Sequence, residues 1–123
     1  MTNFNSLVSS MGKYAQAQYP FESCGIITKS FEFVPSKNLS NKPRQSFMLD
    51  PLLFIEYDEN IWGIFHSHPG DDNPLPSDED RESTTFEQYK FLVGFNNKFH
   101  IYWYDKNIKA LMFDRFEEKH LAN

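Results

Sequence analysis

Hydrophobic positions near the start of the chain repeat with the spacing of a helix. Between residues 3 and 18 they form one stripe on a 3.6-residue repeat. Its members are Phe4, Leu7, Val8, Met11 and Ala15. Pro20 lacks an N–H and disfavours helical backbone at the residue before it. The pattern therefore predicts a helix over 3–18 that ends before Pro20.

Short apolar runs, typical of strands, follow this helix. The clearest are CGIIT at 24–28 and IWGIFHS at 61–67, whose continuous apolar character predicts buried strands. The full set of predicted strands is 24–28, 31–34, 46–49, 61–67, 91–95, 99–104 and 108–113. The last three are separated by Asn- and Asp-containing segments that are typical of hairpin turns. The pattern thus predicts a chain that contains both helices and strands.

Polar segments mark the loops and the remaining helix starts. Residues 35–45 and 69–76 are rich in proline and polar residues, which predicts loops. Asp50-Pro51 has an N-cap residue followed by the residue preferred at the first helical position, and it predicts a helix to about Asp58. A polar helix with a capped start is predicted from Ser77 to about Gln88.

Length and composition limit the classes of protein. The 123 residues predict a single domain over 1–123, and 40% apolar with 24% charged residues is typical of a globular chain. A net charge of −5 without a basic patch gives no support to nucleic-acid binding. The lone cysteine excludes an internal disulfide, and neither a secretory signal nor an 18-residue apolar run is present. We expect a cytoplasmic protein without membrane contact, and its oligomeric state stays open.

Two histidines at the end of a predicted strand carry the main chemical signal. Side chains alternate along a strand, so His66 and His68 project from the same face. Paired imidazoles suit zinc. Asp80 lies at the third helical position after Ser77, the predicted N-cap, where a carboxylate is stabilised by the helix dipole. Two histidines and one aspartate leave a fourth position for water, as in catalytic zinc sites.

A hydrolytic site also needs a base, and Glu22 is the candidate. It lies on the short link between the first predicted helix and the strand at 24–28. Its carboxylate would face a metal-activated water if that strand neighbours the strand at 61–67. Spacing alone leaves this adjacency open.

Glu22, the HSHP segment at 66–69, and Ser77-x-x-Asp80 together resemble the JAMM (MPN+) metalloprotease motif. The PFESCGII segment at 20–27 is similar to the start of the prokaryotic JAB branch. The resemblance implies a zinc peptidase or isopeptidase with a cytidine-deaminase-like α/β fold, a mixed sheet flanked by helices. It implies that His66, His68 and Asp80 bind Zn²⁺.

By the same resemblance, Glu22 is the general base and acid, and Ser77 stabilises the oxyanion. Residues 8–95 also resemble the N-terminal domain of phage tail assembly protein K. Two features depart from these patterns. Eight residues separate His68 from Ser77 where the family usually has seven, and the chain has no room for the NlpC-type second domain of such tail proteins.

Several alternatives remain at this point. The substrate could be a tail protein, a peptidoglycan peptide, or a ubiquitin-like or sulfur-carrier protein. A non-catalytic, zinc-stapled module of a phage tail tip is a second class, and manganese, iron or cobalt could replace zinc. Cys24 could act as a nucleophile with His66 or His68 as its base. A deaminase is disfavoured, because that chemistry uses a P-C-x-x-C pair and this chain has one cysteine.

Overall fold

The computed structural model describes residues 3–69, 90–94, 101–105, 114–115 and 117–121. The predicted helix from Ser77 to Gln88 and the predicted strand at 108–113 lie outside these ranges, as does nearly all of the loop predicted at 69–76. Among the described residues, no helix is long and apolar enough to cross a membrane.

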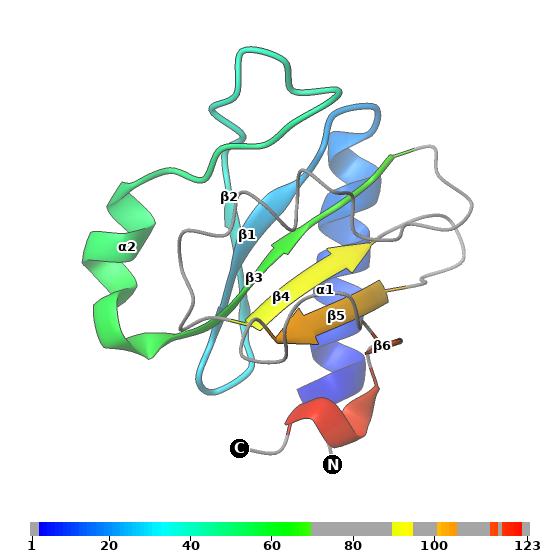
Figure 1. The fold of residues 1–123 in the computed structure, drawn as a ribbon, viewed down its shortest axis with the longest axis vertical. Helices are drawn as coiled ribbons and strands as arrows, with labels where there is room; N and C mark the ends of the chain where they lie inside the picture. The colour runs from blue at the N-terminus through cyan, green and yellow to red at the C-terminus, as the bar shows by residue number, and fades with distance from the viewer. Residues whose placement is uncertain (1–2, 70–89, 95–100, 106–113, 116, 122–123) are drawn as a thin grey trace.

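The described chain consists of helices and strands in the predicted mixture (Figure 1). In chain order they are α1 Asn3–Gln18, β1 Cys24–Thr28, β2 Phe33–Ser36, α2 Leu52–Tyr57, the 3-10 turn η1 Asp58–Asn60, β3 Ile61–His66, β4 Lys90–Gly94, β5 Ile101–Asp105, β6 Asp114–Arg115 and the 3-10 turn η2 Glu118–Leu121. The predictions of the first helix, of the strand at 24–28 and of the strand at 61–67 are confirmed to within one residue.

The strands form a single mixed sheet in the described residues, in the order β2-β1-β3-β4-β5-β6. Only β3 and β4 are parallel, and the other neighbours run antiparallel. The expected α/β class with a mixed sheet flanked by helices is therefore confirmed. The adjacency that the sequence left open is also settled, because β1 pairs directly with β3.

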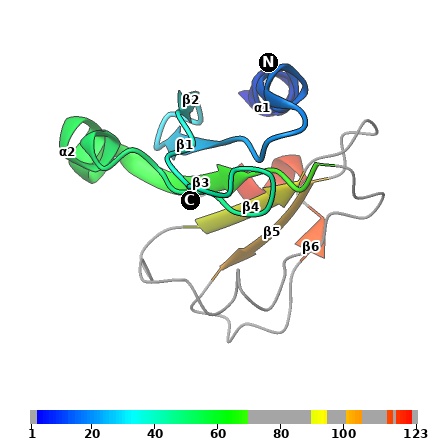
Figure 2. The same ribbon diagram turned by 90° about the horizontal axis from the view of Figure 1, so that it is seen from above.

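Helix α1 covers one face of this sheet, behind it in Figure 1 and above it in Figure 2. Its apolar stripe supplies the helix side of the core, and β1 and β3 supply the other side. The buried cluster consists of Leu7, Met11, Ala15, Ile27, Trp62 and Phe65. Burial of each larger side chain is worth about 1.5–3 kcal/mol, so the stripe read from the sequence fixes α1 on the sheet.

Strand β2 begins two residues later than the predicted strand at 31–34. Phe31 has a positive φ of 64°, and its N–H bonds to the Thr28 carbonyl at 2.8 Å, so it belongs to the turn after β1. The strand then includes Pro35, which the sequence had assigned to a loop. Proline is tolerated there because β2 is at the end of the strand order, where a missing N–H breaks no ladder on the outer side.

The prediction of a strand at 46–49 is wrong, because these residues belong to a loop organised by one side chain. The Asn38 amide nitrogen donates to the carbonyls of Glu22 and Ser46, each at 2.9 Å. Its oxygen accepts from the N–H groups of Ser40 and Met48, each at 3.0 Å. An asparagine side chain that satisfies four backbone groups replaces the strand partner these residues would otherwise need.

The second helix begins one residue later than the sequence predicts, with Pro51 rather than Asp50 at the N-cap position. The Asp50 carboxylate accepts the Leu52 N–H at 3.0 Å, and α2 follows directly. Both views show α2 beside the β2 end of the sheet, well away from α1.

Candidate metal centre

Three side chains that the sequence singled out converge at one end of β1 and β3. Ligand atoms of Glu22, His66 and His68 all lie within 4.8 Å of one another. Glu22 and His66 are buried and His68 is half-buried. Two nitrogens and one carboxylate in such a small volume form a group that could hold a metal ion.

The register of β1 against β3 explains this convergence. Cys24 pairs with His66 and Gly25 pairs with Phe65 in an antiparallel ladder. Continued past its last pair, the same register places Ser23 opposite Ser67, and then Glu22 opposite His68. Residues 42 or more positions apart in sequence are therefore brought together by backbone pairing.

The two imidazoles are placed as ligands of one ion would be. Their Nε2 atoms are 3.2 Å apart, and their ring centroids are 5.0 Å apart. Two nitrogens bound to one tetrahedral zinc at about 2.0–2.1 Å would lie about 3.3–3.4 Å apart. The separation thus fits a shared metal, and the alternation that predicted one common face for His66 and His68 is consistent with it.

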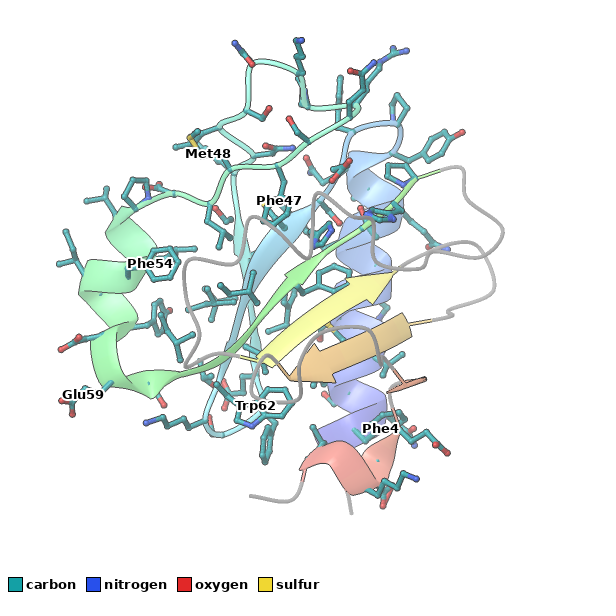
Figure 3. All side chains as sticks on the ribbon, in the orientation of Figure 1. Phe4, Phe47, Met48, Phe54, Glu59 and Trp62 are labelled. Atoms are coloured by element: carbon teal, nitrogen blue, oxygen red, sulfur yellow. The ribbon has the colours of Figure 1, made fainter. Side chains whose placement is uncertain are left out.

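An aromatic ring covers the first of these histidines. Phe47 stacks on His66 with centroids 4.3 Å apart and planes inclined by 16°. Figure 3 shows Phe47 turned inward from the loop that Asn38 organises, whereas the neighbouring Met48 points away from the sheet. The exposed fraction of His66 is 1%. The ring therefore excludes water from one side of the imidazole, which strengthens electrostatic interactions there.

Glu22 is held through its backbone rather than by a regular element. Its N–H donates to the Pro43 carbonyl at 2.7 Å, and its carbonyl accepts from the Asn38 side chain. Both partners belong to the loop that carries Phe47. The loop between β2 and α2 therefore fixes the carboxylate-bearing segment and covers His66 at the same time.

Cys24 lies beside this group but is unsuited to nucleophilic attack. Its side chain is fully buried. The pKa of the thiol is raised to about 12, chiefly by burial, with the hydrogen bond to Ser36 partly offsetting the rise and the charge of Glu22 adding to it. A nucleophilic cysteine needs a thiolate near neutral pH. These features disfavour the hypothesis of a Cys24 nucleophile.

The remaining site residues of the sequence analysis, Ser77 and Asp80, lie outside the described residues, and their roles stay predictions. Conversely, the sequence analysis predicted no contact of Phe47 or Asn38 with the candidate site. Phe47 is one of thirteen phenylalanines, and nothing in the letters around it indicates a histidine partner. Asn38 lies in the polar segment 35–45, for which the sequence predicts only a loop.

Comparisons with known proteins show what this chain is similar to. The model of the family described as prokaryotic homologs of the JAB domain matches residues 4–105. The chain is 29% identical over 102 residues to the desampylase of Haloferax volcanii, covering 72% of this chain and 73% of that protein. It is 35% identical over 75 residues to tail tip assembly protein K of Escherichia phage N15, which is 55% of this chain but only 30% of that protein.

Two solution structures share the fold. A Desulfitobacterium hafniense protein matches with a TM-score of 0.66 and 20% identity over 96% of this chain and 95% of that one. A Salinibacter ruber protein matches with a TM-score of 0.52 and 16% identity over 92% of this chain and 86% of that one.

Proposed function

Because this chain belongs to the family of prokaryotic JAB-domain homologs, we propose that it is a zinc-dependent metallopeptidase that hydrolyses a peptide or isopeptide amide bond. The observation that carries the proposal is the buried convergence of one carboxylate and two imidazoles, with the two Nε2 atoms 3.2 Å apart. Inclusion of the Haloferax desampylase among its relatives supports a hydrolase.

The donor set fits the proposed metal. His66 and His68 supply nitrogen ligands, and we propose Asp80 as the third ligand. A zinc ion held there would lower the pKa of a water molecule to about 7 and polarise the scissile carbonyl. His68 is only half-buried, and we propose that a substrate approaches the group from its exposed side.

Glu22 would accept and donate the proton that the reaction transfers. Glu22 lies within 4.8 Å of the imidazole nitrogens, so its carboxylate can accept a proton from the attacking water. The same carboxyl group then donates this proton to the nitrogen of the leaving amine. We propose that Ser77 donates a hydrogen bond to the oxyanion as the carbonyl carbon becomes tetrahedral.

For the substrate we propose a protein with an amide or isopeptide linkage, on the strength of the desampylase relationship over most of both chains. A second candidate is a role in phage tail assembly or in cleaving cell-wall peptides. The local identity to tail tip assembly protein K favours it, although this chain spans under a third of that protein. A non-catalytic zinc-stapled tail module is the remaining alternative.

The first test is elemental analysis of the purified protein, with the double variant His66→Ala/His68→Ala as its control. We expect about one zinc per chain in the wild type and none in the control. Absence of metal, even after refolding with zinc, would overturn the proposal.

The second test concerns hydrolysis. Glu22→Gln should keep zinc and lower cleavage of ubiquitin-like fusions or of cell-wall peptides by about 10²–10⁴-fold. His68→Ala should lose both zinc and cleavage. Zinc binding without cleavage of either substrate class by the wild type would favour the structural module instead.

A further inference from the structure

Ser67 lies between the two candidate ligands, and its side chain contacts the residue after Glu22. The Ser67 hydroxyl oxygen accepts the Ser23 N–H at 2.8 Å and the Ser23 hydroxyl at 2.9 Å. The Ser67 N–H in turn donates to the Ser23 carbonyl at 2.9 Å. Three hydrogen bonds therefore join one residue of the histidine segment to one residue of the glutamate segment.

This pair continues the β1–β3 ladder beyond its last regular pair, Cys24 with His66. In a regular ladder the Ser23 N–H would bond to a backbone carbonyl, but here a side-chain oxygen takes that place. Both serines are buried, with exposed fractions of 1% for Ser23 and 2% for Ser67. Bulk water therefore cannot replace the bonds that the Ser67 hydroxyl accepts. A buried N–H without a partner costs stability.

We propose that Ser67 is a positioning residue that fixes the carboxylate of Glu22 relative to His66 and His68. This inference rests on the proposed hydrolytic function, because it concerns the geometry of the proposed base. Ser67 is covalently joined to both histidines and hydrogen-bonded to the neighbour of Glu22. Its hydroxyl therefore sets the distance between the base and the ligands.

The position of Glu22 matters because catalysis depends on the exact placement of the base. A displacement of about 1 Å of a catalytic group can cost about 10²-fold in rate. Glu22 lies outside a regular strand. Without the Ser67 hydroxyl, only the Ser67 N–H to Ser23 carbonyl bond of these three would still join the two segments, beside the loop contacts of Glu22 with Asn38 and Pro43.

The test compares Ser67→Ala with three matched variants. Ser67→Thr retains the hydroxyl, Ser23→Ala removes one bond of the three but keeps the Ser23 N–H, and Ser10→Ala removes an exposed serine hydroxyl on α1 that bonds to the Ser6 carbonyl. For Ser67→Ala we expect a kcat lowered about 10–100-fold, with KM and zinc content within about twofold of wild type. Ser67→Thr should recover most of the rate, Ser23→Ala should lose less, and Ser10→Ala should match wild type.

Two further readouts separate positioning from general stability. In the metal-free protein, Ser67→Ala should speed amide hydrogen exchange at Ser23 about 10–100-fold, while amides in the middle of β1 and β3 keep their rates. In a double-mutant cycle, Ser67→Ala should lower the residual rate little when Glu22→Gln is already present. Equal losses in both backgrounds would indicate a merely structural role and overturn the inference.

The outcomes are distinct from those of the proposed function. A wild type without zinc or hydrolysis overturns both proposals before any serine variant is made. An active wild type whose Ser67→Ala variant keeps its kcat within twofold overturns this inference alone. If Ser67→Ala does not fold, a folded Ser67→Thr decides the question. A kcat near that of wild type supports the proposal, and a lost kcat with the exchange rate of the Ser23 amide unchanged would contradict it.

Discussion

The ring of Phe47 lies nearly parallel to the imidazole of His66, with centroids 4.3 Å apart and planes inclined by 16°. Phe47 comes from the loop between β2 and α2, and His66 ends β3. The contact thus joins the loop that holds the backbone of Glu22 to the strand that presents the histidines. Apolar cover of this kind controls the solvent access and dielectric around a metal ligand.

Replacing Phe47 by alanine should weaken metal binding. Loss of the stacked ring opens one side of His66 to water and frees its side chain, so we expect zinc affinity to fall about 10-fold, at the lower end of effects outside the ligands themselves. Chelator competition measures this change. Phe47→Tyr keeps the ring and serves as the control. Equal zinc affinity of the alanine variant and the wild type would show that the stack has no influence on the metal.

Cys24 should be inert in the folded protein. Its thiol is buried and its pKa is raised to about 12, chiefly by burial, so almost no thiolate exists at pH 8. We expect a thiol reagent to modify Cys24 only after denaturation, and Cys24→Ala to keep hydrolysis. Loss of cleavage in a folded, zinc-containing Cys24→Ala variant would restore the nucleophile hypothesis.

The same thiol makes stability depend on pH in the alkaline range. The folded-state pKa of about 12 lies above the ordinary value of 9.0, so between these values the unfolded chain loses a proton that the folded chain keeps. Stability from this group is fully present below pH 9 and is lost as pH rises toward 12. Urea unfolding at pH 8, 9 and 10 should show a smaller decline in the free energy of unfolding for Cys24→Ala than for the wild type.

Gly25 should not tolerate a side chain. A Cβ at this position would collide with the Val34 carbonyl oxygen and come within 2.6 Å of the Phe33 ring. Because the oxygen belongs to the backbone of the paired strand β2, the strand itself must move. We expect Gly25→Ala to destabilise the fold by about 3 kcal/mol, the upper range for overpacking. Thermal unfolding measures this, and a melting temperature equal to that of the wild type would contradict the close approach.

The Asn38 side chain should contribute more to the free energy of unfolding than an ordinary loop residue does. Its side chain makes four hydrogen bonds to backbone groups of Glu22, Ser40, Ser46 and Met48. At about 0.5–1.5 kcal/mol each, with partial replacement by water, Asn38→Ala should lower the free energy of unfolding by about 2 kcal/mol. Asn41→Ala, an exposed asparagine in the same loop, is the matched control and should have little effect.

The local pattern predicted the elements that depend on local physics. The stripe in α1 follows from a 3.6-residue repeat, and the apolar runs of β1 and β3 are short and continuous. The pattern failed at 46–49, where a short apolar segment pairs with no strand in the described part of the chain and the Asn38 side chain satisfies its backbone groups instead. It also placed Pro35 in a loop, because the sequence cannot say that β2 is at the end of the strand order.

The sequence by itself determined the chemistry available to this protein. It determined two histidines on one strand face, a glutamate before the first strand, a single cysteine and a family motif. The tertiary structure alone decided that Glu22 lies beside His66 and His68, that Ser67 bonds to Ser23, and that Phe47 covers His66. The physical reason is that strand register and loop closure join residues far apart in the chain. Hydrophobic periodicity describes which face a residue occupies, but it carries no information about which distant residue pairs with it.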